Sequence, residues 1–146
     1  MKLIVKELNE MTAEEFFEVA KERVKVFVVE QTCPYQEIDE DDKVAKHIIL
    51  KNDDNQIMAY TRIMNRVDYV TFGRVLVVEE FRGQELGKKI VELTLAEINQ
   101  LNLKKDIKIS AQNYLTDFYG CFGFEVISDV YLEDDIPHID MLLKVN

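Results

Sequence analysis

Residues 70–110 read VTFGRVLVVEEFRGQELGKKIVELTLAEINQLNLKKDIKIS, and this stretch decides the fold. Its apolar and β-branched residues from 70 to 78 predict a strand, and apolar residues at helical spacing predict a helix over roughly residues 84–100. Alternation at Ile107-Lys108-Ile109 predicts a second strand. A strand, a helix and a strand in this order form a parallel crossover, which is right-handed in nearly all proteins. The stretch therefore predicts an α/β architecture.

The segments before this crossover consist of a helix and short strands. Residues 2–8 are a strand candidate, and a capping box at Thr12-Ala13-Glu14-Glu15 begins a helix that we expect to end near Glu30. Residues 31–44 contain a proline and an acidic run, so we expect a loop there. The next strand candidates are residues 47–50, 56–64 and 70–78. The links between them are too short for crossovers, which predicts an antiparallel meander.

The chain after the crossover adds a short helix and two more strands. We expect the helix over residues 114–121 and the strands over residues 124–127 and 139–145. The predicted fold class is α/β (α+β), with a mixed, mostly antiparallel central sheet of six to seven strands flanked by three to four helices. Only 5 glycines and 2 prolines occur, and no linker or repeat is present. We therefore expect residues 1–146 to form a single domain.

Charge and composition exclude several classes of protein. The chain has 18 Lys and Arg against 28 Asp and Glu, a net charge of −10, which argues against binding to nucleic acid or to an acidic membrane surface. The sequence has no run of about 18 apolar residues and no signal-peptide pattern. Its two cysteines, Cys33 and Cys121, form no C-x-x-C motif. These features predict a reduced, cytoplasmic protein.

The turn Arg82-Gly83-Gln84-Glu85-Leu86-Gly87-Lys88 is a candidate anion site, because it connects a strand to the start of a helix. Unpaired backbone N–H groups and the helix dipole favour phosphate at such a position, and Lys88 and Lys89 add positive charge. The spacing is neither that of a Walker A loop nor G-x-G-x-x-G. The simpler alternative is that these glycines serve only the turn.

A second segment, residues 111–124, places a short helix directly after a strand. Taken alone, its aromatic residues are typical of a hydrophobic core. Together the two segments resemble the GNAT N-acetyltransferase family, through Arg82-Gly83-x-x-Leu86-Gly87 and Asn113-x-x-x-x-Phe118-Tyr119-x-x-x-Gly123-Phe124. The motifs similar to its ElaA-like branch are Arg23-x-x-x-Phe27-Val28-Val29-Glu30-Gln31-x-Cys33-Pro34-Tyr35, Asp39, Asp42, His47, Gly73-Arg74-Val75, Ala111-Gln112 and Pro137-His138-Ile139-x-Met141.

The resemblance implies a GNAT fold with acetyl-CoA as co-substrate and no metal. It implies that Leu76 and Val77 pair with the pantetheine through their backbone. It further implies that the cofactor's pyrophosphate is held by Arg82, Gly83, Gln84, Glu85, Leu86, Gly87 and Lys88. Asn113 would touch the cofactor, and Tyr119 would stand near the thioester sulfur as the catalytic general acid. Glu85 departs from the family pattern, which has a glycine there, and its Cβ and carboxylate are expected to weaken binding of the cofactor.

The acceptor side is assigned to Glu30, His47 and His138 as substrate-binding residues. Either histidine could help to deprotonate an amine, and the alternative for each is a structural histidine. Glu30 could instead pair with Arg23 at the helix margin. The acidic run over residues 37–42 is expected to be solvated, or to attract a cationic acceptor.

The function predicted in this way is direct transfer of an acetyl group from acetyl-CoA to a primary amine of an unidentified acceptor. The alternative is a degenerate acyl-CoA-binding or interaction module without catalysis, in which Glu85 has disabled the turn. A thiol hydrolase using Cys33 or Cys121 is a third hypothesis, although no local signature supports it. By analogy with the family, a homodimer is compatible with the sequence.

Overall fold

The computed structural model describes residues 1–145 of the chain. The α-helices are α1 (Ala13–Val24), α2 (Leu86–Leu101) and α3 (Thr116–Gly120). The strands are β1 (Lys2–Glu7), β2 (Lys46–Lys51), β3 (Ile57–Asn65), β4 (Tyr69–Val77), β5 (Asp106–Gln112), β6 (Glu125–Val126), β7 (Tyr131–Glu133) and β8 (Ile136–Leu143). Short 3-10 or π-helical segments lie between them, at Leu8–Glu10, Lys25–Glu30, Glu40–Lys43, Glu79–Phe81 and Asn113–Leu115.

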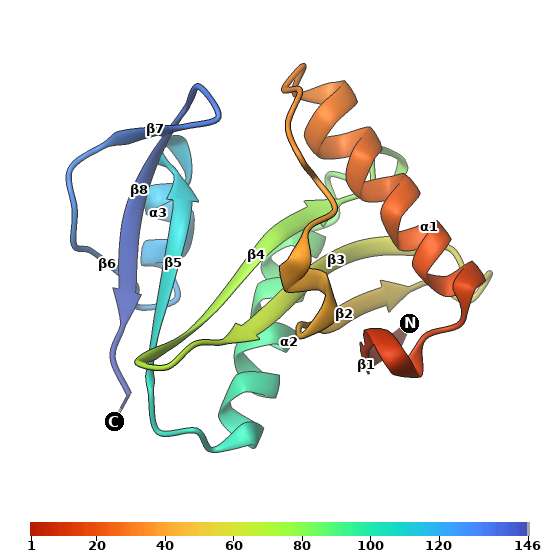
Figure 1. Cartoon of the computed structure of the whole chain (residues 1–146), viewed down its shortest axis with the longest axis horizontal. Coiled ribbons are helices and arrows are strands. Elements are labelled where there is room, and N and C mark those ends of the chain that lie inside the picture. Colours follow the sequence, from red (N-terminus) through yellow and green to blue (C-terminus); the bar gives the residue numbers. More distant parts are fainter. Residues whose placement is uncertain (146) are drawn as a thin grey trace.

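The strands form one sheet in the order β1-β2-β3-β4-β5-β8-β6, with β7 paired to β8 (Figure 1). Every pairing is antiparallel except that of β4 with β5. The predicted meander and the predicted parallel crossover are therefore both confirmed. The described residues contain eight strands, more than the six to seven expected, because β6 and β7 have only 2 and 3 residues and little periodic pattern.

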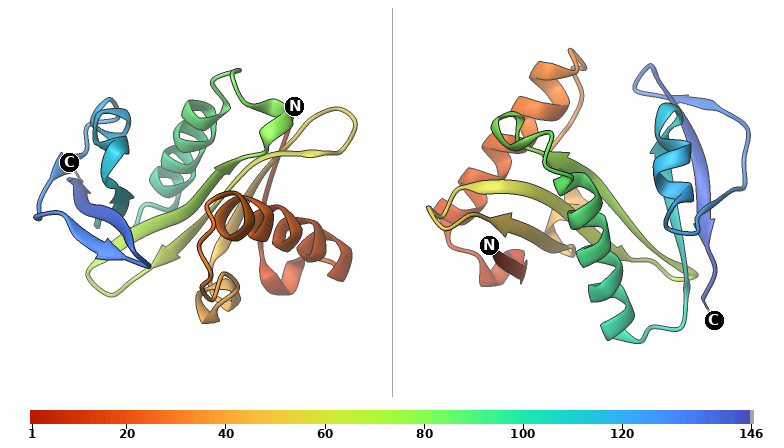
Figure 2. Two further views of the ribbon diagram at one scale, coloured as in Figure 1. Left: turned by 90° about the horizontal axis from the view of Figure 1, so that it is seen from above. Right: turned by 180° about the vertical axis from the view of Figure 1, so that it is seen from behind.

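Helices cover both faces of the sheet. Figure 2 shows α2 and α3 on one face and α1 on the other. The core on the α2 side includes Ile90 and Val91, which are both fully buried. The core on the α1 side packs Val19 and Phe27 against strand residues such as Ile49. Burial of each large aliphatic side chain stabilises the fold by about 1.5–3 kcal/mol, so these two layers hold the sheet in place.

Helix α1 begins with the predicted capping box. The Thr12 hydroxyl accepts a hydrogen bond from the Glu15 N–H at 3.0 Å, and the Glu15 carboxylate accepts one from the Thr12 N–H at 2.9 Å. The predicted helix does reach Glu30, but its last six residues, Lys25–Glu30, widen into a π-helical turn. Single π-helical turns within helices are frequent at functional sites.

A bulge in β4 lies in the part of that strand that no longer pairs with β5. Arg62 of β3 pairs with Gly73, whereas Tyr60 pairs with Leu76, so β4 carries one extra residue between them. Arg74 lies in this bulge with φ of 54°, a left-handed conformation that is unusual for a residue with a Cβ. Pairing of β4 with β5 is confined to Tyr69 and Val70. Beyond Val70 the two strands diverge, as Figure 1 shows.

Residues 31–44 are mostly loop, as expected, but Glu40–Lys43 forms a 3-10 turn within them. In the part of the chain that the structure describes, no helix combines the length and the apolar character needed to cross a membrane.

Candidate functional site

The diverging ends of β4 and β5 border a cavity of about 480 Å³. Gly73, Arg74 and Val75 line it from β4, and residues 108–112 line it from β5. Further walls come from β3, from α3 and the turn before it, from β8 and the β7–β8 hairpin, and from the loop after the π-helical turn. The cavity therefore lies where the sheet opens between β4 and β5, beside the bulge, and its walls come from segments far apart in the sequence.

Tyr119 lies at this cavity and is 6% exposed. Its ring packs between Phe118 and Phe124, with centroids 5.0 and 6.1 Å away. Burial raises the pKa of Tyr119 to about 12, so its hydroxyl remains protonated at neutral pH. Among the hydrogen bonds of the described residues, none involves this hydroxyl. The geometry thus leaves a protonated donor at the cavity with no protein partner.

The turn before α2 presents unpaired backbone N–H groups. The first backbone hydrogen bond of α2 runs from the Lys89 N–H to the Glu85 carbonyl. Within residues 1–145, no carbonyl accepts from the N–H groups of residues 83–88. Gly83 has φ of 84°, and a Cβ on Gly87 would only touch Val77 and Phe118 at 3.9 and 4.0 Å. Free amides at the start of a 16-residue helix suit a diphosphate, so this turn fits the group that the sequence predicts there.

Glu85 is the N-cap residue of α2 and adopts the left-handed conformation, with φ of 59° and ψ of 26°. Its side chain is exposed and makes no capping hydrogen bond. A residue with a Cβ is strained in this conformation, whereas glycine is not. The position that departs from the motif is therefore also one where the backbone favours glycine.

Arg82 joins Glu30 to the end of β4. Its Nε donates to the Val77 carbonyl at 2.9 Å, and its Nη2 lies 2.7 Å from the Glu30 carboxylate. Glu30 therefore pairs with Arg82, and the alternative of a pair between Glu30 and Arg23 is not what the structure shows, because Arg23 bonds Glu37 and Asp42. Leu76 is buried in the core beneath α1. The structure thus brings Glu30, Val77 and Arg82 together beside the turn, although neither they nor the turn line the cavity.

His138 lines the cavity and is 8% exposed. Its Nδ1 lies 2.7 Å from the Ile136 carbonyl, and its Nε2 lies 3.5 Å from the Glu133 carboxylate. Its ring stacks on Tyr131 with centroids 6.3 Å apart. The structure places this histidine on the β7–β8 hairpin, across the cavity from the wall that carries Arg74.

His47 and Asn113 lie outside the cavity. His47 is fully buried, its Nδ1 is 2.6 Å from the Tyr60 hydroxyl, and its Nε2 is 3.0 Å from the Asp42 carbonyl. Both ring nitrogens are therefore occupied within the protein, and the structure does not bring His47 to the predicted acceptor side. Asn113 is exposed in the turn before α3.

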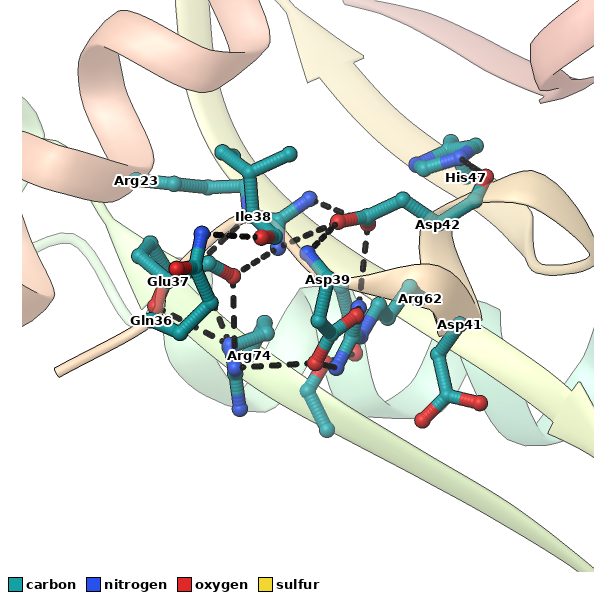
Figure 3. Close-up of polar contacts among 12 residues, drawn as sticks. Arg23, Gln36, Glu37, Ile38, Asp39, Asp41, Asp42, His47, Arg62 and Arg74 are labelled. Carbon is teal, nitrogen blue, oxygen red and sulfur yellow. Dashed lines mark hydrogen bonds and ion pairs between the residues drawn. The ribbon is translucent and has the colours of Figure 1, made fainter. Parts of the chain in front are cut away.

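A buried ionic cluster ties the acidic loop to the sheet (Figure 3). Arg23, fully buried, lies 2.7 Å from the Glu37 carboxylate and 2.6 Å from that of Asp42. Arg62 bonds Asp42 at 3.0 Å. Arg74 bonds Glu37 at 3.0 Å, so the cluster reaches the bulge. The cluster therefore holds the loop as a fixed wall of the cavity.

The expected solvation of the acidic run is wrong for Glu37 and Asp42, which are 3% and 2% exposed. Burial alone raises the pKa of Asp42, but the hydrogen bond and charge of Arg23 lower it overall. Arg23 was the available signal, because a charged residue facing the core needs a buried partner. The partners could not be identified from spacing.

The sequence assigned no role to most of the residues that line the cavity, although several of them lie in the motifs quoted above. On one side the Arg74 guanidinium lies 5.2 Å above the Tyr35 ring. On the other side the wall residues Ser110 and Asp140 are joined by the Tyr131 hydroxyl, which donates to Asp140 at 2.6 Å and hydrogen-bonds the Ser110 hydroxyl. No group of three or more histidine, cysteine or acidic side chains among residues 1–145 is arranged to hold a metal ion. These polar groups are bonded to one another, and a few such groups among apolar wall residues can fix the orientation of a ligand.

Comparisons with known proteins agree with this geometry. Residues 7–145 match the family model described as an acetyltransferase (GNAT) domain. Protein ElaA of Escherichia coli K12 is 39% identical over 143 residues, which cover 94% of this chain and 92% of that protein. The crystal structure of an acyl-CoA N-acyltransferase from Pseudomonas aeruginosa is similar with a TM-score of 0.91 and 39% identity, over 97% of both chains. The crystal structure of Escherichia coli ElaA also has a TM-score of 0.91, with 35% identity over 97% of this chain and 99% of that one.

Proposed function

Because the chain belongs to the GNAT acetyltransferase family, in its ElaA-like branch, and is an acyltransferase, we propose that it transfers the acetyl group of acetyl-CoA directly to a primary amine. The observation that carries the proposal is the Tyr119 hydroxyl, which is protonated and lacks a protein partner at the cavity between β4 and β5. Such a group is suited to act as the general acid of an acyl transfer.

The donor side of the proposed site is the turn before α2 together with the free edge of β4. The N–H groups of residues 83–88 and the charge of Lys88 would hold the pyrophosphate, and Leu76 and Val77 would pair with the pantetheine. Asn113 would contact the cofactor from the turn before α3. When bound, acetyl-CoA supplies an acetyl group activated as a thioester, with a thiolate as the leaving group.

The residues of this chain would orient the reactants and move the protons. Fixed walls on both sides of the cavity would hold the amine in line with the thioester, and such positioning accounts for much of the rate of a two-substrate reaction. A backbone N–H near Val77 would stabilise the oxyanion that develops. The Tyr119 hydroxyl would donate to the departing sulfur, and its proton is replaced by one released from the acceptor nitrogen.

Direct transfer is favoured over a route through an acylated cysteine. Burial and the nearby Asp134 and Asp135 raise the pKa of Cys33, which lowers the fraction of reactive thiolate. Its Sγ also donates to the Asp134 carbonyl at 3.4 Å. Cys121 is exposed and does not line the cavity. We therefore expect Cys33→Ser and Cys121→Ser variants to keep their activity.

We further propose that the whole chain acts as one domain in the cytoplasm, where its free cysteines would stay reduced. The net charge of −10 supports a small amine or a peptide amine as acceptor, in preference to nucleic acid or an acidic membrane surface. A homodimer is compatible with this function and is not required by it.

The test is an amine panel screened for release of CoA thiol, with calorimetric titration of acetyl-CoA alongside. We expect acetyl-CoA to bind and at least one amine to stimulate thiol release. Binding without thiol release for any amine would favour the non-catalytic alternative. Absence of heat at millimolar acetyl-CoA would favour an interaction module and would overturn the proposal.

A further inference from the structure

We propose that His138 is the general base of the transfer, and that Glu133 positions the acceptor amine against it. This inference rests on the proposed function and assigns the acceptor side of the same cavity. It arises from three features of the β7–β8 hairpin: the orientation of one imidazole, the carboxylate beside it, and the place of both at the cavity.

The surroundings of His138 select one form of its neutral ring. A backbone carbonyl can only accept a hydrogen bond, so the contact of 2.7 Å with the Ile136 carbonyl requires the hydrogen on Nδ1. The lone pair of the neutral ring is then on Nε2. Stacking on Tyr131, with the ring planes 26° apart, holds the ring in this orientation. His138 therefore presents a basic nitrogen at the cavity.

His47 provides the contrast within the same chain. Its Nε2 donates to the Asp42 carbonyl, so its Nδ1 accepts from the Tyr60 hydroxyl. Both of its nitrogens are thus bonded to neutral partners in the core, as expected for a structural histidine. The Nε2 of His138 instead has as its neighbour a carboxylate, which can accept a hydrogen bond but cannot donate one when ionised. Two acceptors face one another there, and a donor between them would bond to both.

A primary ammonium is such a donor, because it carries three N–H bonds on one nitrogen. Nε2 and the Glu133 carboxylate oxygen are 3.5 Å apart, so one ammonium can donate to both at once. The Glu133 side chain is 53% exposed, which places it where an amine enters from solvent. The geometry therefore points to a protonated primary amine as the form that binds.

Charged groups of both signs lie around His138. Lys108 of β5, 4.0 Å from the Asp140 carboxylate, and Arg74 of β4 are cations in the same cavity lining. The charges nearest to His138 along its own hairpin are acidic. Asp134 and Asp135 form the tip of its own hairpin, and Asp140 follows on β8 with one oxygen bonded to Tyr131. From the facing loop, the Cys33 thiol donates to the Asp134 carbonyl. The neighbouring strand β5 contributes Gln112 opposite His138 in the register, and that neutral amide contacts the equally neutral Gln31. The carboxylates of the hairpin would attract an incoming ammonium to this side of the cavity.

The proton and bond changes balance as follows. The acceptor ammonium gives one proton to Nε2, and the neutral amine then attacks the acetyl carbon. The carbon–nitrogen bond forms, the carbon–sulfur bond breaks, and the proton of Tyr119 goes to sulfur. A second proton leaves nitrogen and restores the tyrosine, while the imidazolium returns its proton to solvent. The products are the acetylated amine and the free thiol, with one proton released.

The experiment measures kcat/KM for thiol release against pH, with acetyl-CoA saturating and the best amine of the panel varied. His138→Gln should lose about 10²-fold at neutral pH, at the low end of general-base contributions. At pH 10 about a third of a typical alkylamine is already neutral without help, so the deficit should shrink to a few fold. His138→Ala should regain activity with added imidazole. Glu133→Gln should mainly raise KM for the amine and leave kcat within a few fold.

His47→Gln is the matched control, because it removes a histidine from the core and not from the cavity. It should lower the unfolding midpoint without a deficit that disappears at high pH. An active wild type with His138→Gln unchanged at neutral pH, or with a deficit equal at all pH values, would overturn the inference alone. A wild type that binds acetyl-CoA but responds to no amine would overturn the proposed function and this inference with it.

Discussion

Glu85 gives the sharpest test of the donor side, because two substitutions separate its charge from its backbone conformation. Glu85→Gln removes the charge and keeps the Cβ, whereas Glu85→Gly removes both. The residue is exposed and left-handed, with φ of 59°, in the turn that would hold the pyrophosphate. The two variants should therefore have similar CoA affinities, which the charge controls, and different stabilities, which the backbone conformation controls.

The expected magnitudes follow from that geometry. The left-handed conformation costs a residue with a Cβ about 1–2 kcal/mol, and glycine avoids this cost. Glycine also gives the unfolded chain more conformational entropy, which lowers the free energy of unfolding by about 0.4–1 kcal/mol and offsets part of the gain. Glu85→Gly should thus raise the free energy of unfolding by about 0.5–1 kcal/mol, or about 1–4 °C in Tm, and Glu85→Gln should not. A carboxylate in a solvated turn beside a diphosphate costs on the order of 1 kcal/mol. Both variants should therefore bind CoA about fivefold more tightly.

The assay is calorimetric titration with CoA at low and high salt, with pantetheine as the control ligand that lacks the diphosphate. The gain in affinity should be present for CoA, absent for pantetheine, and reduced in 1 M salt, because salt screens exposed charges. Equal or weaker CoA affinity in both variants would refute the electrostatic reasoning. A gain of the same size for pantetheine would place the effect away from the pyrophosphate.

Three further predictions concern the proton donor and the buried cluster. Tyr119→Phe should lower kcat for thiol release by about 10²-fold while CoA affinity and Tm stay unchanged, and a full loss of CoA binding would contradict the role in proton transfer. Arg23→Met should lower the free energy of unfolding in urea by about 3–5 kcal/mol, because it leaves Glu37 and Asp42 buried without their cation. Glu40→Gln, which removes the exposed pair with Lys43, should change this free energy little. Equal effects of the two substitutions would contradict a stabilising role of the buried cluster. The pKa of Asp42 is lowered in the folded protein, so its contribution is complete above its ordinary value of 3.8 and is lost as pH falls through the lowered value. Asp42→Asn should therefore flatten the acid side of the stability profile, and an unchanged slope would count against this reasoning.

Local signals predicted the elements well. The capping box at Thr12 and the alternation in the meander depend on neighbours within a few residues, so both could be recognised directly. The bulge at Arg74 could not, because its left-handed backbone accompanies ion pairs with Glu37 and Asp39 from a distant loop. Strand β7 has 3 residues, too few for a periodic pattern.

The candidate site likewise has a part that local motifs predict and a part that depends on contacts between distant segments. The turn before α2 and Tyr119 were identifiable because each belongs to a short contiguous motif. The acceptor side depends on contacts between segments remote in sequence, such as that of Cys33 with Asp134. Of the two histidines, which appeared equivalent in the sequence, burial and bonding leave only His138 at the cavity.

A crystal structure with CoA bound tests the central claim most directly. The account predicts the diphosphate on the N–H groups of residues 83–88, the pantetheine along the free edge of β4, and the sulfur within hydrogen-bonding distance of the Tyr119 hydroxyl. A diphosphate bound elsewhere, or a Tyr119 hydroxyl turned away from the sulfur, would contradict it.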